Sequence, residues 1–193
     1  TLRALRGLAG TLPLVFTCRS AREGGEAVAL DEAQVVALYE AVAATRCVEF
    51  VDYELYNDPV RVQRLRECTR AHKVRLILSY HNFSYTPGID FLVDQFLEAE
   101  RRGADVAMVS VMPRDRADVL TLLAATDRAD AKTRIPLISM SMGGVGSPSR
   151  LMGWIYGSAA TFAVGKSSSA PGQIGIDELR AVLATLRQSV LGR

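Results

Sequence analysis

His81 is the residue best suited by type to move protons in this chain. An imidazole titrates near neutrality and serves as general acid and base, and His81 closely follows the apolar run VRLILS at 74–79. A lone histidine more often has a structural role. The other histidine, His72, ends a polar segment with helical spacing, where it favours a role as charge partner. His81 is therefore a candidate catalyst that needs support from neighbouring motifs.

The segment FTCRSAREGGE offers partners for this histidine. Arg19 supplies a guanidinium for an anion, and Glu23 or Glu26 supplies a carboxylate that can orient an imidazole. Gly24 and Gly25 let the loop turn sharply. The alternative interpretation is an exposed charged loop. That alternative is stronger for Glu26 than for Arg19, which closely follows the apolar core of a predicted strand.

Two later segments are suited to an anionic ligand. The loop KSSSAPGQ at 166–173 is rich in hydroxyls and backbone N–H groups that bind a phosphate or carboxylate, although such loops are often flexible linkers. The run SMSMGGVG places Met140 and Met142 on one face of a strand and leads to Arg150. The planar guanidinium of an arginine matches a carboxylate.

These residues lie on alternating strands and helices. Apolar runs rich in β-branched and aromatic residues are typical of strands, and the intervening segments carry helical spacing and caps such as Asp31 with Gln34. Strands are predicted at 13–18, 48–55, 74–79, 105–112, 135–141 and 160–164. Helices are predicted near 1–12, 31–44, 58–72, 91–103, 115–126, 150–156 and 177–188, the last capped by Asp177.

This alternation implies parallel βαβ units, in either a doubly wound sheet or a (β/α) barrel. No Gly-rich dinucleotide motif follows a strand, and polar residues recur where strands meet the following loops. We therefore expect a barrel with its active site at the carboxyl ends of the strands. A (β/α)8 barrel typically needs about 250 residues. Six predicted strands in 193 residues leave the ring two βα units short.

The composition is that of one globular domain over residues 1–193. The chain is 49% hydrophobic and 23% charged, and its net charge is +2. Its Lys and Arg residues are scattered, which does not favour nucleic acid as a partner. The three cysteines are odd in number and irregularly spaced, so we predict neither a disulfide framework nor a zinc site, and a reduced cytoplasmic setting fits. We expect neither a membrane span nor a secretion signal.

Six segments, taken in order, resemble the type I 3-dehydroquinate dehydratases of the shikimate pathway. They are PLVFTCRSAREGGE, SYHNFSYTP, GADVAMVSVMP, PLISMSMG, SRLMGWIYGSAATF and SAPGQI. The resemblance implies a (β/α)8 TIM-barrel fold whose first two βα units are absent from this chain, which begins at Thr1 as if within a helix. It also implies a cytoplasmic lyase, often a homodimer, that dehydrates 3-dehydroquinate to 3-dehydroshikimate through a lysine Schiff base without cofactor or metal.

Carried over residue by residue, the resemblance implies a role for each candidate. His81 becomes the general acid/base, and Glu23 becomes the carboxylate that orients it. The remaining residues contact the substrate or line its pocket. The substrate carboxylate and hydroxyls would be held by Arg19, Arg150, Ser169 and Gln173, and the pocket would be lined by Phe83, Met140 and Phe162.

Met108 stands where the family pattern has its Schiff-base lysine. A thioether neither forms an imine nor donates a proton, so we expect impaired dehydratase activity. Methionine is close to lysine in length, so we expect the fold to tolerate it. Two alternatives stay open. One is a binding protein that holds dehydroquinate or dehydroshikimate without turnover, either natural or altered to trap a ligand. The other is a Schiff-base enzyme that uses Lys166 instead.

Overall fold

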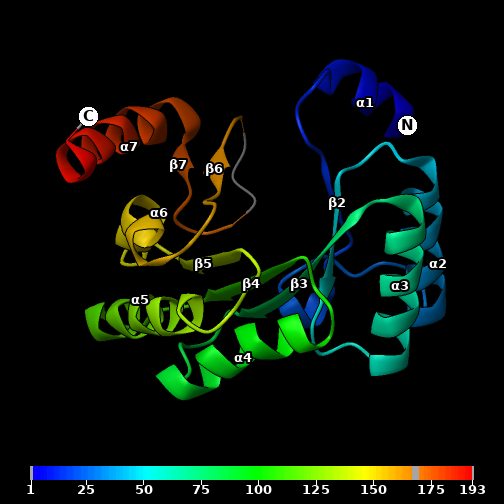
Figure 1. Ribbon diagram of the computed structural model, residues 1–193, viewed down its shortest axis with the longest axis horizontal. Coiled ribbons are helices and arrows are strands. Elements are labelled where there is room, and N and C mark those ends of the chain that lie inside the picture. Colours follow the sequence, from blue (N-terminus) through cyan, green and yellow to red (C-terminus); the bar gives the residue numbers. More distant parts are fainter. Residues whose placement is uncertain (1, 167–169, 193) are drawn as a thin grey trace.

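A parallel five-stranded sheet is the frame of the molecule. The computed structural model describes residues 2–166 and 170–192. The strands lie side by side in chain order and every neighbouring pair is parallel. They are β1 (Val15–Thr17), β2 (Phe50–Glu54), β3 (Arg75–Asn82), β4 (Val106–Val111) and β5 (Leu137–Ser141). The carboxyl ends of all five strands therefore meet at one edge of the sheet (Figure 1), as the predicted α/β architecture requires.

Helices connect the strands, and capping side chains fix where several of them begin. The Asp31 side chain accepts from the backbone N–H of Gln34, whose side chain reaches back to Asp31, so the predicted capping box is confirmed. The helices are α1 (Leu2–Ala9), α2 (Glu32–Thr45), α3 (Pro59–His72), α4 (Ile89–Arg101), α5 (Arg116–Asp130), α6 (Ser147–Met152) and α7 (Ile176–Leu191), with 3-10 turns η1 (Ala21–Glu23) and η2 (Gly153–Tyr156). Over residues 2–166 and 170–192, no helix is long and apolar enough to span a membrane.

The two faces of the sheet have different partners because side chains alternate along each strand. One set of alternate residues, which includes Leu76, Leu78 and Val109, joins the main core formed with the helices. The other set forms a second, smaller cluster on the inner face of the sheet. Its buried members are Ile77, Val106, Met108, Ile138 and Met140. This inner face is where a barrel would place its functional side chains.

The sixth predicted strand, 160–164, does not extend the main sheet. β6 (Ala163–Val164) instead pairs with β7 (Ile174–Gly175) in a separate two-stranded sheet. Serine hydroxyls occupy the hydrogen-bonding edge of β5 in place of a strand: the Ser139 N–H donates to Ser158 Oγ at 3.0 Å and the Ser141 N–H donates to Ser149 Oγ at 2.8 Å. Among the described residues, parallel pairing between this region and β5 is limited to an isolated bridge between Leu137 and Ser158.

Several helix boundaries also differ from the sequence-based prediction; α5, for example, extends to Asp130 instead of ending near 126. α6 begins at Ser147 rather than at Arg150, and the chain continues as η2 after it. α7 begins at Ile176 with Gly175 at its cap, and Asp177 lies in the first turn without capping it. A carboxylate in the first turn still stabilises a helix through the helix dipole, which explains why Asp177 resembled a cap in the sequence.

Candidate active site

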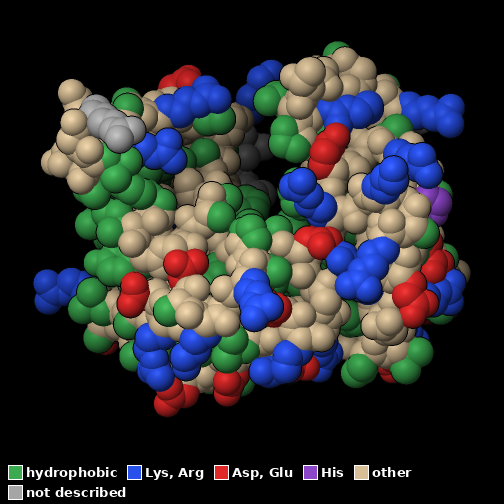
Figure 2. Space-filling view, in the orientation of Figure 1, with side chains coloured by type: hydrophobic (Ala, Val, Ile, Leu, Met, Phe, Trp, Pro, Cys, Tyr) green, Lys and Arg blue, Asp and Glu red, His purple; other side chains and the backbone are tan. Residues whose placement is uncertain are grey.

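A cavity of about 380 Å³ opens at the carboxyl ends of the central strands. In Figure 2 the surface is also visibly hollowed between the part of the molecule that carries α7, β6 and β7 and the part that carries α1. The cavity is lined by Thr17, Arg19, Glu23, Gly24, Gly25, Glu26, Asp52, His81, Phe83, Met108, Ser110, Met140, Met142, Phe162, Ala170 and Gln173. Its volume falls in the range of small-molecule sites, about 300 to 1,000 Å³.

His81 and Glu23 form a buried pair at this cavity. The Oε2 atom of Glu23 lies 2.9 Å from His81 Nδ1 and accepts the backbone N–H of His81 at 3.0 Å. This geometry favours the imidazole tautomer with its proton on Nδ1, which leaves Nε2 as an acceptor. The structure therefore selects Glu23 over Glu26 as the partner of the histidine.

Burial sets the charge of this pair. Desolvation, with a smaller effect of the Arg19 guanidinium, lowers the pKa of His81 to about 4. Desolvation and the neighbouring Glu54 carboxylate raise the pKa of Glu23 to about 8. Both shifts favour the uncharged forms of the two side chains. A neutral imidazole is the form that accepts a proton from a substrate.

Two glycines place Glu23 against His81. Gly24 has a φ of +83°, and a Cβ atom built on it would lie 2.3 Å from a ring carbon of Phe83. A Cβ atom on Gly25 would lie 2.0 Å from the backbone oxygen of Arg19. Phe83 in turn stacks beside His81 with ring centroids 6.5 Å apart. The loop after η1 therefore requires residues without side chains, because the ring of Phe83 and the backbone of Arg19 fill that space.

Acidic groups hold Arg19 at the edge of the cavity. Its guanidinium donates to Asp52, and Nη1 donates to Ser79 Oγ at 2.8 Å. Nη1 also lies 3.8 Å from an oxygen of Glu54. The other carboxylate oxygen of Asp52 is buried and has no hydrogen-bond partner among the described residues. Arg19 thus lies in the cavity wall, and its charge is already balanced by carboxylates.

Met108 lies on the inner face of β4, below the level of His81. It pairs in register with Ser79, which precedes His81 by two residues and shares its face of the sheet. Its side chain is buried and packs within the inner-face cluster that includes Ile138 and Met140. Met108 and Met140 therefore contribute thioether groups to the cavity wall, beside the hydroxyl group of Ser110.

Arg150 is the most deeply buried charged side chain near the site, with 1% of its surface exposed. Its guanidinium donates to the carbonyl oxygens of Phe162 at 3.4 Å and Pro171 at 3.1 Å, and Nη1 lies 3.6 Å from the sulfur of Met140. Desolvation lowers the pKa of Arg150. Among the described residues, Arg150 forms no ion pair and its Nε atom has no hydrogen-bond partner. This buried cation lies one layer behind the cavity wall and is suited to an anionic ligand.

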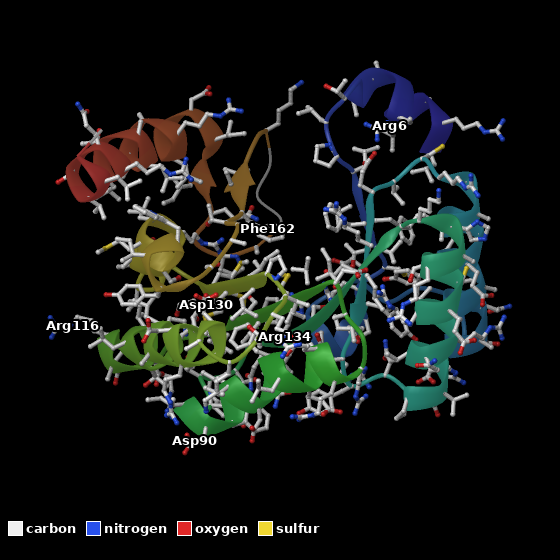
Figure 3. All side chains as sticks on the ribbon, viewed as in Figure 1. Arg6, Asp90, Arg116, Asp130, Arg134 and Phe162 are labelled. Carbon is white, nitrogen blue, oxygen red and sulfur yellow. The ribbon has the colours of Figure 1, made fainter. Side chains whose placement is uncertain are left out.

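The remaining predicted residues fall into three groups. Phe83, Met140, Phe162 and Gln173 line the cavity, and Figure 3 shows Phe162 between β6 and the main sheet. Ser169 lies outside the described residues. Lys166 is exposed after β6 and does not line the cavity.

Sequence reasoning missed Ser110 as a lining residue, although a signal was present. Ser110 follows Met108 by two residues on the same strand, so alternation places both on one face. Asp52 had no role in the sequence-based prediction, and the structure shows its direct contact with Arg19. Within 2–166 and 170–192, no cluster of three or more histidine, cysteine or acidic side chains is arranged to hold a metal ion.

Comparison with known proteins gives one consistent result. Residues 1–190 match the family model described as type I 3-dehydroquinase. The 3-dehydroquinate dehydratase of Albidiferax ferrireducens is 52% identical over 188 residues, which cover 97% of this chain and 71% of that protein. The corresponding protein of Geobacillus kaustophilus is 48% identical over 188 residues, 97% of this chain and 72% of that protein.

Solved structures give the same answer. The crystal structure of the Geobacillus kaustophilus 3-dehydroquinate dehydratase superposes with a TM-score of 0.96 at 47% identity, covering 98% of this chain and 73% of that one. The Clostridium difficile type I 3-dehydroquinate dehydratase, solved with covalently modified comenic acid, gives a TM-score of 0.94 at 37% identity, covering 98% of this chain and 74% of that one.

Proposed function

Since the chain belongs to the type I 3-dehydroquinase family, we propose that its cavity binds 3-dehydroquinate and 3-dehydroshikimate and that it dehydrates the former only weakly. The observation that carries this proposal is the buried His81–Glu23 pair, 2.9 Å apart, at a cavity that Met108 also lines. The resemblance, in turn, assigns Met108 to the position of the family's lysine. His81 and Glu23 supply groups for acid–base chemistry, but Met108 supplies no covalent nucleophile.

The ring acid would bind with its carboxylate toward Arg150. A buried guanidinium without a carboxylate partner among the described residues supports this orientation, because an uncompensated buried charge is costly and a ligand carboxylate relieves that cost. Ser169 and Gln173 would hold the carboxylate and hydroxyls from the loop between β6 and β7. Phe83 and Phe162 would pack against the ring.

His81 would carry the proton transfers. Its neutral Nε2 removes a proton from the ring carbon beside the ketone, and the electron pair of the broken C–H bond moves into an enolate. The C–O bond to the 1-hydroxyl group then breaks as His81 returns its proton to that oxygen, and water leaves. Glu23 keeps the imidazole oriented through Nδ1 during both transfers.

Met108 would slow this reaction because the enolate route lacks the better electron sink. In the family, attack of a lysine amine on the ketone gives an iminium, which stabilises the developing negative charge more strongly than a ketone does. Loss of a catalytic nucleophile commonly costs a factor of about a thousand or more. We expect a loss of that size here.

A turnover assay tests the proposal. The native chain should convert 3-dehydroquinate to 3-dehydroshikimate slowly but measurably, and His81→Gln should abolish the conversion. Calorimetry should detect 3-dehydroshikimate binding to the native chain, and Arg150→Gln should weaken it by about tenfold, because it removes the buried positive charge that attracts the ligand carboxylate from behind the cavity wall. Absence of binding to the native chain at millimolar ligand would contradict the proposal.

A second candidate is a protein that binds these acids without turning them over. The observation that favours it is the packing of Met108 with Ile138 and Met140, which holds the Met108 thioether in an apolar cluster at the cavity. Tight binding with no turnover above the uncatalysed rate would select this candidate. The use of Lys166 as a substitute nucleophile would be detected by borohydride trapping of a lysine adduct. Lys166 is exposed and absent from the cavity lining.

The resemblance also leads us to propose a homodimer in the cytoplasm. The three cysteines of the chain are free thiols, which fits a reducing compartment; they are Cys18, Cys47 and Cys68. Light scattering coupled to size-exclusion chromatography tests the oligomeric state directly.

A further inference from the structure

The thioethers of Met108 and Met140 should favour different ligands from those that an amine at the same place in the cavity would favour. Met108 is 6% exposed and Met140 is 4% exposed, and both belong to the apolar cluster on the inner face of the sheet. Neither thioether donates a hydrogen bond. A ligand carbonyl directed at Met108 would leave water without gaining a donor from that side chain.

The side of the cavity near His81 suits a flat ring. Phe83 stacks beside His81 with an angle of 21° between the ring planes, and the missing side chain of Gly24 leaves room for the Phe83 ring. Phe162 lines the cavity as a second aromatic group. Aromatic side chains gain most from a planar partner, which they can stack upon over its whole face.

The polar groups of the site determine which substituents a bound ligand ring should carry. Arg150 is a buried cation suited to one carboxylate, and it contacts the backbone of Phe162 and the sulfur of Met140, both lining residues. His81 has Nδ1 committed to Glu23, so its Nε2 accepts a hydrogen bond from a hydroxyl donor. These groups favour a ligand with one acid group and one hydroxyl, and the thioether of Met108 adds no hydrogen-bond donor to the polar side chains that line the cavity, such as Ser110.

We propose that the cavity prefers a planar, hydroxylated ring carboxylic acid that presents a C–H edge to Met108 over a ring acid that presents a ketone there. This inference rests on the proposed function, since it assumes that this cavity is the ligand site. Leaving a polar group unpaired on burial is the physical basis of such discrimination.

Two ligands together test how Met108 affects binding. 3-Dehydroshikimate carries a carboxylate, hydroxyls and a ketone, and 3-hydroxybenzoate carries a carboxylate and one hydroxyl with a C–H edge in place of the ketone. The affinity of each is measured by calorimetry for the native chain, Met108→Gln and Met108→Leu. Glutamine is similar in length to methionine and offers an N–H donor, but it cannot form an imine. Leucine retains the apolar character.

The native chain should bind 3-hydroxybenzoate at least about fivefold more tightly than 3-dehydroshikimate, in keeping with the cost of one unpaired carbonyl. Met108→Gln should reverse this order, and Met108→Leu should keep it. Thermal unfolding of each variant verifies that it is folded.

The outcomes separate this inference from the proposed function. If the native chain binds 3-dehydroshikimate more tightly than 3-hydroxybenzoate, the inference is wrong and the proposed function stands. The inference is equally wrong if Met108→Gln and Met108→Leu show the same order of affinities. If the folded native chain binds neither acid at millimolar concentration, the proposed function itself fails.

Discussion

One carboxylate oxygen of Glu23 meets both the backbone N–H and the ring Nδ1 of His81, at 3.0 and 2.9 Å, although the two residues are 58 positions apart in the chain. The first contact fixes the carboxylate to the end of β3, and the second fixes the orientation of the imidazole. The carboxyl end of β3 and the η1 turn that follows β1, two strands away in the sheet, are thereby held together at the cavity.

The shifted pKa values of this pair predict how stability depends on pH. Glu23 has a folded pKa of about 8, above its ordinary value of 4.5, so its stabilising contribution is complete below pH 4.5 and is lost as pH rises toward 8. His81 has a folded pKa of about 4, below 6.5, so its contribution is complete above pH 6.5 and is lost as pH falls toward 4. The two effects oppose each other between 4.5 and 6.5.

Above pH 6.5 only the Glu23 effect remains, so the free energy of unfolding should fall between pH 6.5 and 8. Glu23→Gln lacks the titrating group and should flatten this part of the curve. Urea denaturation at several pH values measures the dependence. An equally steep fall in Glu23→Gln would show that another group is responsible.

Gly24 should be intolerant of even a methyl group. Gly24→Ala forces a non-glycine residue to a φ of +83° and places a Cβ atom against the ring of Phe83, so we expect a destabilisation of about 1–3 kcal/mol. Chemical denaturation provides the value. Gly88→Ala is the matched control, because nothing lies within 4 Å of its added Cβ atom, and a change within about 0.5 kcal/mol is expected there. Equal effects at the two sites would contradict this account.

The Asp105 carboxylate ties α3, β3 and β4 together. It accepts from Arg66 Nη2 at 2.8 Å and from the backbone N–H of Leu76 at 2.8 Å. Asp105→Ala leaves the guanidinium of Arg66, of which 9% is exposed, without its partner. Because Asp105 itself is partly exposed, we expect a loss of about 2 kcal/mol, below the range for fully buried pairs.

Thermal or urea unfolding of Asp105→Ala measures this loss. Arg101→Ala, which removes an exposed ion pair with Glu98, serves as the control and should change the free energy of unfolding by less than about 1 kcal/mol. A similar small change for Asp105→Ala would mean that Arg66 finds another partner or water.

The sequence was sufficient for much of the fold, because alternating strands and helices leave strong local patterns. The capping box of Asp31 and the strand before His81 are examples of such local signals. The sequence could not choose between Glu23 and Glu26 as partner of His81, since that choice depends on the 3-10 turn and the two glycines that follow it.

The prediction of a sixth strand in the main sheet was wrong for a related reason. The segment before β6 has a strand-like composition, but hydroxyl groups of Ser149 and Ser158 take the N–H groups of β5 that a sixth strand would have used. Such side-chain to backbone bonds across the fold have no periodic signature in the sequence. The burial of Arg150 behind Met140 and Phe162 is likewise a tertiary property.

The central claim is that the site is intact apart from the nucleophile at position 108, and the turnover of 3-dehydroquinate by Met108→Lys tests it most directly. The steady-state rate of formation of 3-dehydroshikimate is compared for the native chain and the variant, with thermal unfolding as a check that both are folded. The account predicts that kcat rises by at least about a hundredfold in Met108→Lys, in keeping with the restoration of a covalent nucleophile. Equal, low rates in a folded variant that still binds 3-dehydroshikimate would contradict it.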